Sequence, residues 1–559
     1  MTFRIANCSG FYGDRLSAAR EMVEGGPIDV LTGDWLAELT MFILAGNRLK
    51  GRPGYAPTFL RQLEDVLGPC LDRGIKIVSN AGGLDPAGCA AAVRELAGRL
   101  GLSPVVAHVT GDDLTGRPLD LVNADTGEKL DATPLTANAY LGGRPIAAAL
   151  AAGADVVVTG RVTDAALVTG PGMWRYGWGP GDLDALAGSV VAGHVIECGC
   201  QATGGNYAFF QDVPDLAHCG FPIAELREDG SAVITKHPGT GGMVTVGTVT
   251  AQLVYEIAGP RYPGPDVVAR FDTVMLTPDG PDRVLISGVR GEPPPDTLKA
   301  AVTYQAGYRN TMTLVLTGLD VEAKARVAEE AIWARIPRES FGEVDVTLTG
   351  SGLLRITVMD PDRGRVGRAF SSAVVETGLA SYPGFHGLAP PGDAAPYGVY
   401  WPVLVPAAEV RPRVFLNGDE LTFGTAATPP AAPAGVPGPA GVPQEVPGGP
   451  TARAPLGRIA GARSGDKGGN ANVGLWTDTA GRYAWLAAHL TVPRLKELLP
   501  DLAPYRIDRY ELPAIRALNF VVHGFLGRGV AASPRIDPQA KALGEELRAR
   551  PTDIPSALL

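Results

Sequence analysis

The sequence has few cysteines, no excess of positive charge and no long apolar run. Six Cys among 559 residues cannot form a disulfide framework, which favours a reducing cytosol. The 49 Lys and Arg are outnumbered by 59 Asp and Glu, giving a formal net charge of -10, so no nucleic acid partner is expected. No apolar run approaches the ~20 residues that span a bilayer, so no membrane partner is expected either.

Targeting signals and low-complexity architectures are also missing. The opening segment MTFRIANCSGFYGDR lacks the apolar core of a signal peptide, and a cytoplasmic location is predicted. The 73 Gly and 48 Pro follow no period, which excludes collagen and general disorder. A chain of this length exceeds one ordinary domain, so two to four domains are expected.

The first predicted domain, residues 1–265, alternates short apolar runs with helix-length segments. The expected strands cover residues 3–5, 28–31, 75–79, 105–109 and 156–159. The clearest helix, residues 86–100, has Asp85 as its N-cap and Pro86 at its first position. Apolar strands separated by helices predict an α/β fold with a parallel, doubly wound sheet.

Small or polar residues follow all five of these strands. The carboxyl ends of parallel strands share one edge of a sheet, where ligands bind. Asp164 is a catalytic candidate at this edge. The substrate-binding candidates there are Asn7, Ser9, Asp34, Asn80, Gly82, Gly83, Arg161 and Thr163.

The remaining residues predict two further domains and a linker. Residues 266–424 mix hairpin-like pairs with isolated helices, as in an α+β domain. Residues 425–455 are almost wholly Ala, Gly, Pro, Val and Thr, which predicts an extended linker. Residues 456–559 predict a small α/β sandwich. Its expected strands cover residues 458–462, 472–476 and 518–525, and its expected helices cover 492–499 and 538–550. Asp537 is the expected N-cap of the last helix.

The segment KHPGTGG precedes a helix-like run at residues 249–257 and could hold an anion through its backbone amides. Its binding candidates are Lys236, His237, Gly239, Thr240, Gly241 and Gly242. The alternative is that these glycines only form tight turns. The segment is not a Walker loop, and neither NCSGFYGDR nor SNAGGLDPAG is a GxGxxG motif, which disfavours a nucleotide-dependent enzyme.

Residues 193–206, GHVIECGCQATGGN, hold the densest group of reactive side chains. His194 and Glu197, three residues apart, can share a helical face as a general acid and base. Cys198 and Gln201 are binding candidates beside them. Metal ligation is an alternative, but no metal site is assigned; the other alternative is a buried histidine with inert cysteines.

The segment RSGDKGGNAN, at the start of the last domain, crowds charged and amide groups into a turn. This arrangement is costly unless the groups pair with one another or with a ligand. Asp466 and Lys467 are catalytic candidates, and Arg463, Ser464 and Asn470 are binding candidates. The alternative is a solvated turn.

Six segments together resemble the acyclic terpene utilisation (AtuA) family: NCSGFYGDR, SNAGGLDPAG, VVVTGRVTDAALV, AGHVIECGCQATGGN, KHPGTGGMVTVGTVTAQLVYEI and ARSGDKGGNANVG. The resemblance implies a large N-terminal region to about residue 424 and a ferredoxin-like C-terminal domain. The family takes its name from bacterial breakdown of citronellol- and geraniol-like terpenes through branched acyl-CoA intermediates. Gly469 departs from the polar residue expected in many relatives.

The resemblance, taken with these candidate residues, implies a hydratase- or lyase-type enzyme acting on a branched or terpenoid acyl-CoA or a related carboxylic acid. His194 and Glu197 would transfer protons, and Arg161 and Asp164 would orient the substrate. Coenzyme A would enter as part of the substrate, with no separate cofactor. The alternative is a non-catalytic subunit that binds acyl-CoA or acts as a scaffold. A homo-oligomer is expected because Ala- and Gly-rich chains of this size often bury surface between subunits.

Overall fold

The computed structural model describes residues 2–424 and 446–559, and an eleven-stranded sheet forms its body. The strand order is β11-β12-β8-β7-β1-β2-β3-β6-β4-β18-β19. The five central strands pair in parallel: β1 (Phe3–Asn7), β2 (Val30–Gly33), β3 (Lys76–Ser79), β6 (Val156–Thr159) and β4 (Val106–Thr110). The five predicted strands are confirmed, with small shifts at their ends.

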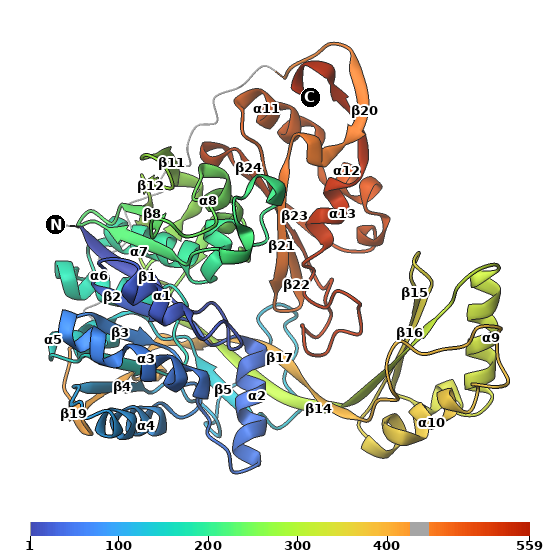
Figure 1. Ribbon diagram of the computed structural model, residues 1–559, viewed down its shortest axis with the longest axis horizontal. Helices are drawn as coiled ribbons and strands as arrows, with labels where there is room; N and C mark the ends of the chain where they lie inside the picture. Colours follow the sequence, from blue (N-terminus) through green and yellow to red (C-terminus); the bar gives the residue numbers. More distant parts are fainter. Residues whose placement is uncertain (1, 425–445) are drawn as a thin grey trace.

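Helices cover both faces of these parallel strands (Figure 1). One face packs against α1 (Ala18–Glu24), α3 (Pro57–Arg73) and α4 (Pro86–Arg99), and the other against α5 (Arg144–Ala151), α6 (Ala166–Tyr176) and α7 (Leu183–Ile196). Neighbouring strand residues such as Val157 and Val158 enter opposite cores because side chains alternate along a strand. Burial on both faces explains why these strands are apolar throughout.

Outside the parallel centre the sheet is antiparallel, so it is a mixed sheet and not a wholly parallel one. On one side lie β7 (Pro222–Leu226), β8 (Ala232–Lys236), β12 (Val284–Ser287) and β11 (Met275–Pro278), and on the other β18 (Arg413–Leu416) and β19 (Asp419–Leu421). Four of these strands come from residues 266–424, so that segment extends the first sheet as well as forming a lobe of its own.

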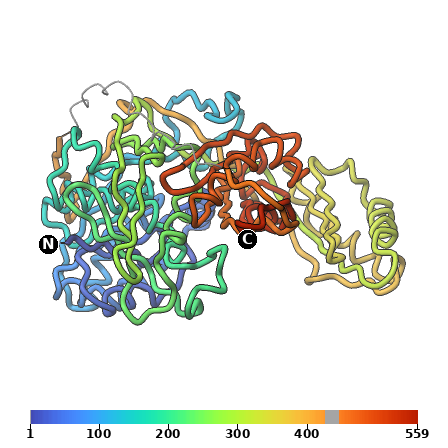
Figure 2. The backbone as a smooth tube through the Cα atoms, turned by 90° about the horizontal axis from the view of Figure 1, so that it is seen from above, coloured from blue at the N-terminus to red at the C-terminus, as the bar shows by residue number. Residues whose placement is uncertain are grey.

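The lobe lies at the end of a long antiparallel ribbon made of β14 (Thr297–Val315) and β17 (Ala395–Pro406). The ribbon pairs with β5 (Thr136–Ala139) on the body and carries the lobe away from it (Figures 1 and 2). The lobe contains β15 (Glu343–Leu348), β16 (Leu353–Asp360), α9 (Val321–Trp333) and α10 (Phe370–Val375). Ile332, Ile356 and Phe370 are fully buried in its separate core.

The C-terminal unit is a four-stranded antiparallel sheet with helices. Its strands run in the order β21 (Gly461–Lys467), β22 (Asn470–Trp476), β24 (Ala517–Val522) and β23 (Ile507–Leu512), with α11 (Ala480–His489), α12 (Val492–Leu498) and α13 (Leu543–Arg548). The RSGDKGGNAN segment is a β-hairpin in which Lys467 pairs with Asn470, and so it is mostly strand. The Asp537 carboxylate accepts from the amides of Lys541 and Ala542, and the helix predicted from residue 538 begins only after them.

Most of the predicted linker, residues 425–445, lies outside the described residues. Its last part is β20 (Thr451–Pro455), a strand paired with β25 (Pro551–Pro555). The other elements are α2 (Glu38–Leu49), α8 (Val246–Leu253) and a small sheet of β9 (Arg261–Pro263), β10 (Val268–Arg270) and β13 (Arg290–Glu292). Within the part of the chain that the structure describes, every helix is too short or too polar to cross a membrane.

The C-terminal sheet packs directly against the end of α8. Gly465 lies against the Tyr255 ring, and the Glu256 amide donates to Asn472 Oδ1 at 2.8 Å. Arg463 crosses to the body, where it donates to Gln201 Oε1 and, at 2.8 Å, to the Asn206 carbonyl. This docking brings the β21–β22 hairpin toward the carboxyl edge of the parallel strands.

Candidate functional site

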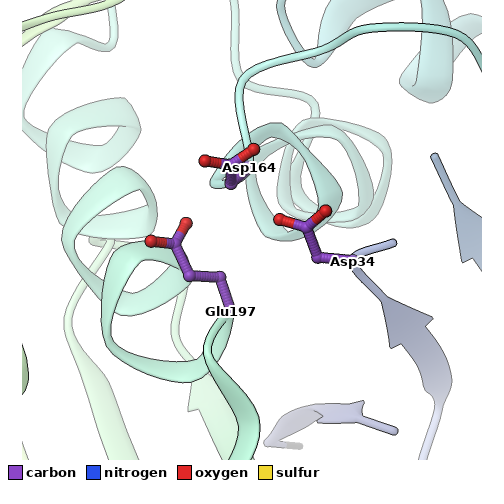
Figure 3. A group of neighbouring side chains, drawn as sticks. All are labelled: Asp34, Asp164 and Glu197. Atoms are coloured by element: carbon purple, nitrogen blue, oxygen red, sulfur yellow. The ribbon is translucent and has the colours of Figure 1, made fainter. Parts of the chain in front are cut away.

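Three carboxylates from separate elements converge at the carboxyl edge of the parallel strands (Figure 3). Asp34 follows β2, Asp164 precedes α6, and Glu197 ends α7. One carboxylate oxygen from each lies within 4.8 Å of the others. Asp34 and Glu197 are buried, at 6% and 8% exposure, while the Asp164 side chain keeps 29% of its surface exposed.

The residues predicted at the strand ends bond the Asp34 side chain and the main chain of Glu197. Asn7 Nδ2 donates to the Glu197 carbonyl at 3.0 Å, and Asn80 Nδ2 donates to Asp34 Oδ1 at 2.5 Å. The Asp34 amide donates to the Ser9 carbonyl at 2.9 Å, so β1 and β2 are joined just past their ends. Asn7 Oδ1 also accepts from the Ser9 amide at 2.7 Å, so the predicted set Asn7, Ser9, Asp34 and Asn80 forms one network. In it Asn80 bonds the Asp34 carboxylate and Asn7 bonds the backbone of Glu197.

Arg161 is the cation next to the cluster. Its guanidinium lies 3.1 Å from Asp164, donates to the Leu36 carbonyl at 3.0 Å and lies over the Tyr140 ring. Thr163 lies beside it and donates its amide to the Leu141 carbonyl. A buried guanidinium is stable here because anionic and aromatic partners surround it.

Burial governs the protonation of the cluster. Burial first, and then the charge of Asp164, raise the pKa of Asp34 and of Glu197 well above the ordinary carboxyl value. Burial, assisted by the charge of Lys467, lowers the pKa of His194 to about 4. His194 is therefore neutral near pH 7, with Nε2 3.1 Å from the Gln252 carbonyl and Nδ1 3.4 Å from Glu197 Oε1.

Two lysines from other units approach the carboxylate cluster. The Lys467 ammonium, from the end of β21, lies 5.5 Å from the centre of the Tyr262 ring. Burial and the nearby charge of Lys299 lower the pKa of Lys467. Lys299, from β14, lies over the rings of Tyr140 and Tyr400. Burial opposes its charge, but the hydroxyl groups of Tyr400 and Tyr140 together with the charge of Glu38 outweigh burial and raise its pKa.

A small open pocket lies where the three units meet. Its lining comes from α2, the β14–β17 ribbon, the β21–β22 hairpin and residues 530–539: Ala37, Glu38, Leu39, Phe42, Thr303, Gly398, Tyr400, Asp466, Gly468, Val530, Ala531 and Gln539. Asp466 lies in this lining, and burial raises its pKa to about 7. A small molecule entering here would meet groups from all three units.

The KHPGTGG loop is bonded to other neighbours. Lys236 Nζ donates to the Thr240 carbonyl at 2.8 Å and lies 3.2 Å from Asp282, while His237 Nε2 bonds the Met22 carbonyl at 2.9 Å. A β-carbon on Gly241 or Gly242 would meet a backbone carbonyl within 2.5 Å, and Gly239 has a φ of +77°. These contacts explain the loop as a packed turn, and its role in binding an anion stays a prediction.

Other predicted binding residues have structural partners. A β-carbon on Gly82 would lie 2.5 Å from the Thr159 carbonyl, and Gly83 has a φ of +53°. Ser464 Oγ accepts from the Gly544 amide and Asn470 Oδ1 from the Gly524 amide. Burial and Glu197 raise the pKa of the Cys198 thiol, which keeps it protonated.

The prediction missed several residues that the fold brings to the site. They are Glu38, Tyr140, Tyr262, Lys299 and Tyr400, together with Glu256, whose charge acts on both Glu197 and Lys467. Lys299 offered a signal, since it is the only charged residue in the β-prone run TLKAAVTYQAGY. The tyrosines belong to strands with no distinguishing motif.

The fold and the site define a multi-unit α/β protein whose buried polar cleft lies between a mixed sheet, a β-ribbon and a small C-terminal sheet. A family model described as acyclic terpene utilisation family protein AtuA matches residues 3–416, and one described as the AtuA ferredoxin-like domain matches residues 454–552. The chain belongs to the AtuA family, and the resemblance stated from its motifs is confirmed. A comparison with curated proteins finds no match.

Proposed function

We propose that this protein is an acid–base enzyme of acyclic terpene utilisation that adds water to, removes water from, or cleaves a C–C bond in a branched acyl-CoA or a related carboxylate. The observation that carries the proposal is that Lys467, from the C-terminal unit, lies near enough to Asp164 and Glu197 of the body for their charges to interact, while its neighbour Asp466 lines a pocket between the units. Groups with shifted pKa values in a cleft between domains are typical of catalytic sites.

The charges around the pocket favour an anionic or carbonyl-bearing substrate. Arg161, Lys299 and Lys467 approach the site from three units, and such cations stabilise a carboxylate or a developing enolate. Behind the pocket wall, Arg309 donates to the Ala531 carbonyl and Arg355 to the Pro534 carbonyl. Their positive charge suits the phosphates of a coenzyme A tail.

Lys467, which lies in the chain between the pocket-lining residues Asp466 and Gly468, is the group that we assign to move a proton on the substrate. Its lowered pKa brings a lysine toward the range where it accepts protons near neutral pH. Asp466, beside it in the pocket lining, is a second group that can exchange a proton near pH 7. His194 is only 1% exposed and is enclosed by Tyr262 and Phe271, so it acts on Glu197 and does not reach the substrate.

Turnover of a panel of branched and straight enoyl-, hydroxyacyl- and acyl-CoAs, with the free acids, tests the proposal. Hydration or dehydration changes the product mass by one water, and lyase cleavage gives two fragments. We expect Lys467→Met to lower kcat by about 100-fold or more, as for loss of a general acid or base. Lys50→Met, at an exposed position after α2, is the matched control and should leave kcat unchanged.

Two results would count against catalysis. Binding of a panel member without any product would favour the non-catalytic binding subunit. Equal kcat in wild type and Lys467→Met would exclude the lysine from the chemistry.

A further inference from the structure

Acceptor atoms without hydrogen-bond donors face one another inside the carboxylate cluster. Among the described residues, Glu197 Oε2 and His194 Nδ1 are buried and have no hydrogen-bond partner. Asp164 Oδ1 lies near Arg161 but receives no aligned hydrogen bond. Buried polar atoms in folded proteins nearly always have a partner, so a missing partner requires an explanation.

The histidine is the most informative of these atoms. The Gln252 carbonyl can only accept a hydrogen bond, so His194 Nε2 must carry the ring proton. Nδ1 then presents a lone pair to Glu197 Oε1 at 3.4 Å. Two acceptors at this distance repel each other unless a proton or a cation lies between them.

The charge of the cluster favours a cation over a proton between His194 and Glu197. Asp34, Asp164 and Glu197 can carry three negative charges, of which Arg161 offsets one by contact and Lys467 offsets part from further away. The negative charge that remains can be balanced by one divalent cation. A proton on Glu197 could satisfy the His194–Glu197 pair alone, but it would leave Asp164 Oδ1 without a partner, whereas one cation can serve all of these acceptor atoms.

We propose that Asp34, Asp164, Glu197 and His194 Nδ1 bind one divalent cation of the Mg²⁺/Mn²⁺ class. Three carboxylate oxygens are ligands that these hard ions prefer, and Mn²⁺ also accepts an imidazole nitrogen. Adjacent ligands on an octahedral ion lie about 3 Å apart and opposite ligands about 4.2 Å apart, given metal–oxygen distances of about 2.1 Å. The 3.4 Å between His194 and Glu197, and the carboxylate separations of no more than 4.8 Å, reach these values through small side-chain rotations.

The surroundings of the cluster suit a bound ion. The backbone of β1 and α7 is held by Asn7, and Asp34 is oriented by Asn80, as expected for residues that support metal ligands. Asp164 is the most exposed of the three carboxylates, so the ion enters and exchanges water on that side. This proposal goes beyond the proposed function and is tested without any substrate.

The test is direct binding of Mn²⁺ to the full-length protein after treatment with EDTA. We expect calorimetry to give one site per chain and a rise in melting temperature with Mn²⁺ concentration. Glu197→Gln and Asp34→Asn should each weaken Mn²⁺ binding by about 100-fold or more, and His194→Gln by about 10- to 100-fold. Glu95→Gln, on the exposed face of α4, is the matched control and should bind Mn²⁺ like wild type.

Two further measurements keep the test decisive. Glu197→Gln removes one buried charge from a repelling cluster, so the metal-free variant should melt at or above the wild-type temperature while losing the Mn²⁺-induced shift. Electron spin-echo spectroscopy of bound Mn²⁺ should show a nitrogen coupling that disappears in His194→Gln. Absence of Mn²⁺ binding to wild type, equal affinity in Glu197→Gln, or a strong preference for Zn²⁺ would overturn the proposal.

Discussion

Gly474 of β22 lies against Val254 at the end of α8, with no space for a side chain between them. A β-carbon on Gly474 would lie 2.4 Å from Val254 Cβ and 2.5 Å from its carbonyl oxygen. Because backbone atoms of the body limit this contact, it fixes how closely the C-terminal sheet approaches. The position of Lys467 in the cleft depends on the same approach.

Gly474→Ala should therefore push the C-terminal sheet away from α8. We expect the free energy of unfolding to fall by about 1–3 kcal/mol, as for overpacking of a core. The Glu256 amide, which donates to Asn472, should lose protection in hydrogen exchange. Gly481→Ala in α11 is the control, because its β-carbon would make only ordinary contacts and should slightly stabilise the helix. Unchanged stability of Gly474→Ala would mean that the interface has room to adjust.

Arg161→Met should destabilise the protein by about 3 kcal/mol, because it leaves buried carboxylates without their adjacent cation. Thermal and denaturant unfolding measure the change. The double variant Arg161→Met/Asp164→Asn should recover part of this loss, since the unpaired charge is removed as well. Arg99→Met, which loses only an exposed ion pair with Glu95, should change the stability by less than about 0.5 kcal/mol. Equal losses in the single and double variants would contradict the pairing.

Stability should depend on the charge of Asp466. Its pKa is about 7 in the folded protein and about 3.8 when unfolded, so the folded state binds the proton more tightly. The stabilisation from this proton is full below about pH 4 and is lost as the pH rises through about 7. Relative to wild type, Asp466→Asn should therefore gain stability by on the order of 4 kcal/mol between pH 4 and pH 8. Parallel stability curves for the two proteins would contradict this, and exposed Asp501→Asn is the control.

Lys236→Met separates the two interpretations of the KHPGTGG loop. If the loop is a packed turn, loss of the Asp282 and Thr240 partners should lower the melting temperature and leave KM unchanged. If the loop binds an anionic group of the substrate, KM should rise, also in assays run well below the melting temperature. Steady-state kinetics and thermal unfolding of the same preparation give the answer.

Local patterns in the sequence were enough to predict the parallel strands and the polar residues that follow them. Apolar runs identified the parallel strands, and the rule that ligands gather at their carboxyl ends led to Asn7, Asp34 and Asp164. Lys299 and Tyr400 could not be found in this way, because long-range pairing of β14 with β17 and β5 brings them to the cleft. The glycine-rich loops were ambiguous for a physical reason: glycine allows close approach to a ligand and to the protein's own backbone equally well.

The separation of the site residues along the chain also sets the order in which the site is completed during synthesis. Asp34, Asp164 and Glu197 all lie in the first two-fifths of the sequence, while Lys467 is added only in the last fifth. Domains generally fold from the N-terminus as the ribosome makes them, so the carboxylates can gather before their opposing lysine exists. A nascent chain halted after the β-ribbon would therefore hold the acidic half of the site alone, and chemistry that needs both halves would begin only with the finished polypeptide.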